Sequence, residues 1–204
     1  MGRSQIHALI FDIGQVIVRV DPLNMAKAFA RRVGKEPEVL LRDIEKDAAL
    51  RDFQEGRLTP EQWHEHLSRR LGRRLPFQEF YTAWNQALRE PLLDEDLFAR
   101  LRERYRLVLL SNTDPIHVDY MDEAYGFLEY FPIHLFSHTL GASKPSEVVY
   151  RRAIAAAGVA PERILYIDDI PAYVEAGRRA GMQVYRFQSP GALWSEYSVR
   201  RILV

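Results

Sequence analysis

Six polar side chains in this sequence are of the kinds that hold a metal ion and a phosphate group: Asp12, Ser111, Asn112, Lys144, Asp168 and Asp169. Carboxylates suit Mg²⁺, which is commonly bound by one or two of them together with a substrate phosphate. A hydroxyl and an ammonium group beside helix N-termini would bind the phosphate oxygens. Taken singly, the aspartates could instead cap turns and helices, and the lysine could be solvated. Together and in this order, the six indicate phosphate chemistry.

Strands and helices must alternate to bring these side chains together. Continuous apolar runs predict buried strands at 6–13, 106–111, 163–168 and 183–187, with a weaker candidate at 133–137. Helical patterns lie between them at 94–104, 115–125, 145–157 and 171–180, and three of these begin with a proline at the first helical position. This alternation predicts an α/β fold with a three-layer parallel sheet.

The segment 19–90 interrupts the alternation, because it has helical periodicity and no convincing strand. Its candidate helices are 22–33, 36–46, 47–54, 60–71 and 76–88. We therefore expect a helical bundle inserted into an α/β domain that is made of residues 1–18 and 91–204. Aromatic residues of this segment suit the core of the bundle, with one or two facing a cleft as the alternative.

The strand ends are where the chemistry is expected. Ligands bind at the carboxyl ends of the strands in an open parallel sheet. Asp12 ends the first predicted strand, Ser111 and Asn112 end the second, and Asp168 and Asp169 end a later one. Lys144 precedes the proline that opens a helix. The six side chains should therefore converge on one edge of the sheet.

Composition narrows the function classes. The chain has 204 residues, 28 basic and 28 acidic side chains, no net charge and no cysteine. The balance argues against a nucleic-acid partner that needs a basic surface, and the missing cysteines exclude disulfides and thiolate sites. No apolar run approaches the ~20 residues of a membrane span. We expect a cytoplasmic protein with no membrane partner, either monomer or homodimer.

The motifs resemble those of a known family. Ile10-Phe11-Asp12-Ile13-Gly14, Leu110-Ser111-Asn112, Lys144-Pro145 and Ile167-Asp168-Asp169 are similar, in this order, to the four motifs of the haloacid dehalogenase (HAD)-like hydrolase superfamily. The resemblance implies a Rossmann-like core and makes the inserted bundle a cap domain, residues 19–90. Within the superfamily, the stretch 53–63 resembles bacterial glucose-1-phosphate phosphatases and the N-terminal phosphatase domain of soluble epoxide hydrolase.

The resemblance also implies roles. Asp12 would be the nucleophile that forms an aspartyl-phosphate, and carboxylates are competent covalent catalysts. Mg²⁺ would be held by Asp12, the Gly14 backbone carbonyl and Asp169, with Asp168 orienting a metal-bound water. Ser111, Asn112 and Lys144 would bind the phosphate, and Lys144 would also steady the nucleophile. The implied reaction is hydrolysis of a small phosphorylated metabolite, with a sugar phosphate favoured.

Two positions depart from the family pattern. Gly14 stands where relatives usually have an aspartate that acts as general acid and base, a function worth about 10²–10⁴ in rate. Tyr173 stands where relatives usually have Asn or Asp, and we expect it simply to pack on its helix, an altered metal surrounding being the alternative. A metal-independent dehalogenase and a phosphometabolite-binding protein without turnover remain alternative functions.

Overall fold

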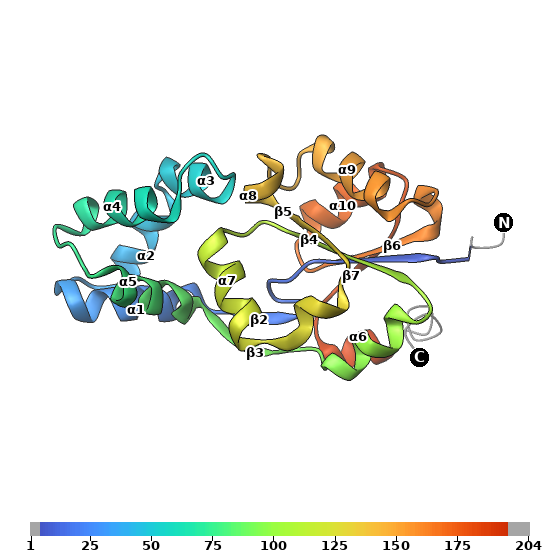
Figure 1. Ribbon diagram of the computed structural model, residues 1–204, viewed down its shortest axis with the longest axis horizontal. Coiled ribbons are helices and arrows are strands. Elements are labelled where there is room, and N and C mark those ends of the chain that lie inside the picture. The colour runs from blue at the N-terminus through green and yellow to red at the C-terminus, as the bar shows by residue number, and fades with distance from the viewer. Residues whose placement is uncertain (1–4, 196–204) are drawn as a thin grey trace.

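The computed structural model describes residues 5–195 and is elongated, with a parallel sheet at one end and a group of helices at the other (Figure 1). The sheet has five strands in the order β5-β4-β1-β6-β7. They are β1 (Ala8–Phe11), β4 (Arg106–Ser111), β5 (Ile133–Phe136), β6 (Ile164–Asp168) and β7 (Gln183–Arg186), and each pairs in parallel with its neighbours. The predicted α/β class is confirmed, and so is the weaker strand.

Helices cover both faces of the sheet because the central strands are apolar on both sides. Side chains of β1, β4 and β6 pack on one face against α6 (Glu95–Arg102) and α7 (Pro115–Ala124). On the other face they pack against α9 (Glu147–Ala157) and α10 (Pro171–Arg179). Full burial of the central strands explains why their sequences are continuous apolar runs rather than alternating ones. Two short helices, α8 (Ser137–Leu140) and α11 (Pro190–Ser195), complete this part of the chain.

One predicted helix of the core begins later than expected. The pattern predicted 145–157 with Pro145 at the first position, but α9 begins at Glu147 and the Lys144–Pro145 peptide is cis. The side chain of Asn112 bonds both the N–H and the C=O of Lys144, at 2.8 and 3.0 Å. Because these backbone groups serve the loop, they are not available to a first helical turn. Pro115 and Pro171 do occupy the first turns of α7 and α10.

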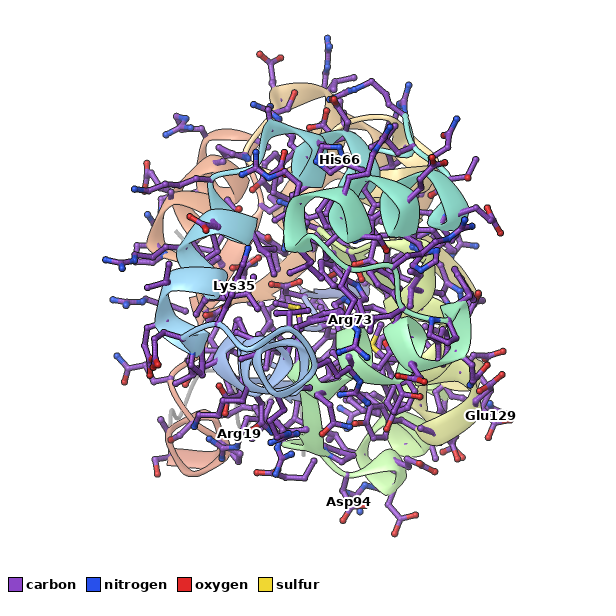
Figure 2. All side chains as sticks on the ribbon, turned by 90° about the vertical axis from the view of Figure 1, so that its left-hand side faces the viewer. Arg19, Lys35, His66, Arg73, Asp94 and Glu129 are labelled. Atoms are coloured by element: carbon purple, nitrogen blue, oxygen red, sulfur yellow. The ribbon has the colours of Figure 1, made fainter. Side chains whose placement is uncertain are left out.

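Five helices lie between Val20 and Leu88, and we call them the inserted helices. They are α1 (Pro22–Val33), α2 (Pro37–Glu45), α3 (Ala48–Gln54), α4 (Pro60–Leu71) and α5 (Phe77–Trp84). A capping box begins α4, since the Thr59 hydroxyl accepts from the Gln62 N–H while the Gln62 side chain accepts from the Thr59 N–H. Figure 2 views the molecule from this end, where Lys35, His66 and Arg73 are labelled.

A short antiparallel pair of strands stands where the inserted helices begin and end. β2 (Val18–Val20) pairs with β3 (Leu88–Pro91), and the Asp21 N–H donates to the Ala87 carbonyl at 2.7 Å. The prediction of a helix over 76–88, and of no strand in 19–90, was therefore wrong at its edges. Helix α5 stops at Trp84, a 3-10 turn covers Asn85–Ala87, and the chain then extends. Pairing with β2, distant in sequence, overrides the local helical pattern there.

The inserted helices have a hydrophobic core of their own. Phe29, Phe53, Trp63, Phe80 and Trp84 are all nearly fully buried in it, and the rings of Phe53 and Trp63 stack at 5.5 Å. This agrees with the core role expected for most of the aromatic residues. His64 bonds the Leu75 carbonyl and His66 bonds Asp47, so the two histidines have separate partners. No helix within residues 5–195 is long and apolar enough to cross a membrane.

Candidate active site

The carboxyl ends of three neighbouring strands place the predicted residues at one edge of the sheet. Asp12 directly follows β1, Ser111 ends β4, and Asp168 ends β6. Because β1 lies between β4 and β6 in the sheet, Asp12 is at the centre of this group. All three side chains are buried. The topology therefore brings together residues that are up to about 150 positions apart in the sequence.

Lys144 lies between two of the aspartates. Its Nζ is 3.0 Å from Asp12 Oδ1 and 2.7 Å from Asp168 Oδ2. Burial alone would lower the pKa of Lys144, but the two carboxylates outweigh it and hold the pKa above its usual value. Lys144 is therefore a buried ammonium group, fully charged at neutral pH. The alternative of a solvated surface lysine is wrong, because Lys144 is buried.

The three aspartates form a cluster that fits a divalent cation. One carboxylate oxygen from each of Asp12, Asp168 and Asp169 lies within 4.8 Å of the others. Burial and the nearby Asp168 raise the pKa of Asp12 to about 6, although Lys144 opposes the shift. Burial and Asp168 also raise the pKa of Asp169. Such shifts mark excess negative charge in a poorly hydrated place, which a divalent cation would neutralise.

Asp168 differs from the other two aspartates in its contacts. Its Oδ2 accepts hydrogen bonds from Lys144 Nζ and the Tyr166 hydroxyl, and its Oδ1 accepts from the Ile170 N–H at 2.8 Å. It is fully buried and is not among the residues lining the cavity described below. Asp168 therefore orients Lys144 and the loop after β6. Its expected role toward a metal-bound water stays a prediction.

A cavity of about 360 Å³ opens in front of these residues. From the strand ends it is lined by Asp12, Gly14, Ser111, Asn112, Lys144 and Asp169. The opposite wall is formed by side chains of the inserted helices, including Met25, Ile44, Gln54 and Trp84. Its volume suits a small metabolite. Every predicted phosphate or metal residue except Asp168 thus lines this one cavity.

Tyr173 belongs to the site, contrary to the expectation that it only packs on its helix. It lines the cavity, its hydroxyl accepts a hydrogen bond from Asn112 Nδ2 at 3.2 Å, and its ring centroid is 5.0 Å from Lys144 Nζ. A cation at this distance from an aromatic ring is attracted by the ring's quadrupole. Tyr173 therefore helps to hold Lys144.

The inserted helices contact the core beside the cavity. At Gly56 a Cβ atom would lie 2.1 Å from the His138 carbonyl oxygen, so only glycine allows this approach. The neighbouring Glu55 carboxylate accepts a hydrogen bond from Ser143, which precedes Lys144. On the other side of the cavity, Trp84 Nε1 donates to Asp114 Oδ2 at 3.2 Å. These three contacts fix how the helices cover the strand ends.

Sequence reasoning missed one pair of residues at this site, Asp114 and His117. They lie 3.0 Å apart at the start of α7, and His117 lines the cavity. The motifs in the sequence give a role to the nearby Ser111 and Asn112 and none to Asp114 or His117. The sequence did offer one indication of this pair. A histidine three residues after a capping aspartate lies beside it at the start of a helix, and this helix begins next to the site.

Comparison with known proteins identifies a family and a related enzyme. Residues 6–181 match the haloacid dehalogenase-like hydrolase family. The chain is 26% identical over 195 residues to D-ribitol-5-phosphate phosphatase from Bacteroides thetaiotaomicron, covering 92% of this chain and 94% of that protein.

Two solved structures have the same fold. A predicted HAD-like family hydrolase from Porphyromonas gingivalis has a TM-score of 0.83 and 28% identity, covering 98% of each chain. A HAD family enzyme from B. thetaiotaomicron, in complex with magnesium and inorganic phosphate, has a TM-score of 0.80 and 23% identity, covering 91% of this chain and 96% of that one. With the strand order and the four motifs, the match over most of its length shows that this chain belongs to the haloacid dehalogenase-like hydrolase family.

Proposed function

We propose that this protein is a Mg²⁺-dependent phosphomonoesterase that acts on a small phosphorylated metabolite, with sugar and sugar-alcohol phosphates as the favoured class. The observation that carries the proposal is the position of Lys144, 3.0 Å from Asp12 and beside three clustered carboxylates at the base of one cavity. The related B. thetaiotaomicron protein is named as a phosphatase of D-ribitol 5-phosphate, which supports the substrate class.

Asp12 is the proposed nucleophile. Its Oδ1 accepts from the Ile13 N–H at 2.7 Å and from Lys144 Nζ, and these contacts fix the direction of the carboxylate. A carboxylate that attacks the phosphorus splits hydrolysis into two displacements, through an aspartyl-phosphate. Lys144 would neutralise charge on the nucleophile and the transferring group, while Ser111 and the Asn112 backbone would bind phosphate oxygens.

Asp12, the Gly14 carbonyl and Asp169 are the proposed ligands of Mg²⁺. When bound, the ion would supply the charge neutralisation that lets an anionic carboxylate approach an anionic phosphate. The chemistry of the donor set fits, because oxygen ligands suit this cation. Asp168 is not a proposed ligand, because its oxygens accept hydrogen bonds from Lys144 Nζ and from the Ile170 N–H in the following loop.

Residues 19–90 are the proposed cap domain. Their helices form the wall of the cavity opposite the strand ends, so the leaving group of a phosphate ester would lie against them. Gln54 from α3 and Glu45 from α2 are polar groups on this wall, beside apolar ones such as Met25. Substrate choice would follow from these side chains.

The experiment is a screen of sugar phosphates, sugar-alcohol phosphates and nucleotides, with Mg²⁺ and with EDTA. We expect Mg²⁺-dependent release of phosphate, fastest with the first two classes, and loss of activity with EDTA. Metal-independent release of halide from 2-chloropropionate would support the dehalogenase instead. Binding of phosphate and Mg²⁺ without turnover of any ester would support a binding protein.

A further inference from the structure

The proposed phosphatase site lacks an obvious proton donor for the leaving group. Gly14 has no side chain, at the position where the family pattern usually has an aspartate. Among the described residues of the cavity wall, Lys144 and Tyr173 have pKa values held above their usual high ranges, so neither is an effective acid near pH 7. His117 is the ionisable group of the wall whose ordinary pKa lies near neutrality.

The imidazole of His117 is oriented by a buried carboxylate. Asp114 has no solvent exposure, and its Oδ2 lies 3.0 Å from His117 Nδ1. Its Oδ1 also accepts from the backbone N–H of His117 at 3.0 Å, as the cap of helix α7. Trp84 Nε1 donates to the same carboxylate, and the Trp84 and His117 rings stack at 5.6 Å. The ring therefore has one defined orientation.

The second ring nitrogen is held much more loosely. Nε2 of His117 is 3.4 Å from the Trp84 carbonyl oxygen, beyond the ordinary range of about 2.7–3.2 Å for such a hydrogen bond. One ring nitrogen is fixed by a carboxylate and the other is weakly bound. This arrangement is typical of a histidine that exchanges protons with a ligand. Because His117 lines the cavity, that ligand would be the substrate.

The surrounding charges favour the protonated form of the ring. Burial would lower the pKa of His117, but the interaction with Asp114 outweighs it and raises the pKa above its usual value. The Trp84 carbonyl, from the inserted helices, acts in the same direction. Asp119, farther along α7, adds a negative charge within range of Asp114, and His138 lies within electrostatic range of Asp119. These charges favour the imidazolium form of His117 more strongly than the charges around an ordinary histidine do.

We propose that His117 donates the proton to the leaving oxygen. It would replace the aspartate that the family pattern has at the position of Gly14. The proposal rests on the phosphatase function above. A carboxylate oxygen of Asp12 bonds to phosphorus as the phosphorus–ester oxygen bond breaks. The ester oxygen leaves with the bonding electron pair and takes the Nε2 proton, which gives an alcohol and neutral imidazole. In the second displacement, a water attacks the aspartyl-phosphate and returns a proton to Nε2, which releases phosphate and restores Asp12.

The test compares leaving groups in the His117→Gln variant. A glutamine can still donate to Asp114 but cannot titrate. We expect kcat/KM, which reports the first displacement, to fall by about 10²–10⁴ for sugar and alkyl phosphates, whose alkoxide leaving groups need a proton. For p-nitrophenyl phosphate, whose leaving group departs as an anion, it should fall only a few-fold. The matched control is His134→Gln, since His134 bonds the Leu128 carbonyl at the sheet edge and does not line the cavity.

A pH profile provides a second readout that a merely structural histidine would not change. For the wild type with an alkyl phosphate, kcat/KM should fall at alkaline pH as His117 loses its proton. His117→Gln should lose this limb, and Asp114→Asn should shift it to lower pH because the carboxylate that raises the pKa is gone. Thermal melting would verify that each variant is folded.

Equal losses for nitrophenyl and alkyl phosphates, with the alkaline limb retained in His117→Gln, would overturn the assignment of the proton donor. Such a result would leave the phosphatase function intact. If the wild type hydrolysed no phosphate ester in the presence of Mg²⁺, the proposed function itself would fail.

Discussion

The ring of Tyr173 and the ammonium group of Lys144 form a cation–aromatic pair, with 5.0 Å between Nζ and the ring centroid. The Tyr173 hydroxyl also accepts from Asn112, whose side chain holds the Lys144 backbone. Tyr173 thus supports both ends of the lysine, through the ring at the head group and through Asn112 at the main chain.

Two substitutions separate the contributions of this tyrosine. Tyr173→Phe keeps the ring and loses the hydrogen bond to Asn112, so we expect a reduction of only a few-fold in kcat/KM. Tyr173→Leu loses both, and a desolvated cation–π contact is worth about 2 kcal/mol, or roughly 30-fold in rate. Steady-state kinetics on one phosphate ester would measure the difference. Equal effects of the two variants would show that the ring does not stabilise Lys144.

Replacing Lys144 should affect both activity and stability. In Lys144→Met the carboxylates of Asp12, Asp168 and Asp169 lose their buried cation, and removing one partner of a buried ion pair costs about 3–5 kcal/mol. We expect no measurable turnover. Urea denaturation of the metal-free protein would give the free energy of unfolding.

The pH dependence of that stability has a definite sign. Asp12 has a folded-state pKa of about 6 against an ordinary 3.8, so the folded state binds more protons and stability falls as pH rises through this range. Without Lys144 the pKa should rise further, and the fall should extend to higher pH. A variant whose stability shows the same pH dependence as the wild type would contradict the proposed charge balance.

Gly56 should be essential for the contact between the inserted helices and the core. Both Gly56 and Gly34 have positive φ, at +71° and +68°, so alanine at either position costs about 1 kcal/mol of backbone strain. Only at Gly56 would the new Cβ meet a backbone oxygen, that of His138, whereas Gly34 has open space. We expect Gly56→Ala to lose substantially more stability and activity than Gly34→Ala. Equal melting temperatures would show that the close approach is not required.

The places of the predicted site residues follow from the sequence more directly than the loops around them do. Asp12, Ser111 and Asp168 could be placed because each ends a buried apolar run, and parallel strands leave only one edge for their carboxyl ends. The regular helices were also predictable, with α4 matching its predicted bounds because a capping box begins it and Gly72 ends it.

Interactions between distant segments could not be predicted in this way. The pairing of Val18–Val20 with Leu88–Pro91 joins residues about seventy positions apart, and the local pattern favoured a helix. Tyr173 was expected to pack on its helix because nothing in its neighbourhood indicates contact with Lys144. His117 was missed because its importance depends on Asp114 and on a tryptophan from another part of the chain.

Gly14 has room for the side chain it lacks. A Cβ atom built there would meet Val20 Cγ2 at 3.5 Å, an ordinary van der Waals contact, and Gly14 does not have positive φ. We therefore expect Gly14→Asp to fold. In the His117→Gln background it should recover part of the lost activity on alkyl phosphates, since it supplies a carboxyl group next to the nucleophile. Gly14→Ala is the matched control, and equal activity of the Asp and Ala variants would contradict the prediction.

The most direct test of the account is acid quenching of the protein during turnover of a phosphate ester with Mg²⁺, followed by mass spectrometry. We predict a transient mass increase of one phosphoryl group on the peptide that contains Asp12, labile to hydroxylamine and absent from Asp12→Asn. Turnover that is undiminished in Asp12→Asn, or a phosphoryl group carried by a different residue, would contradict the assignment of Asp12 as the nucleophile.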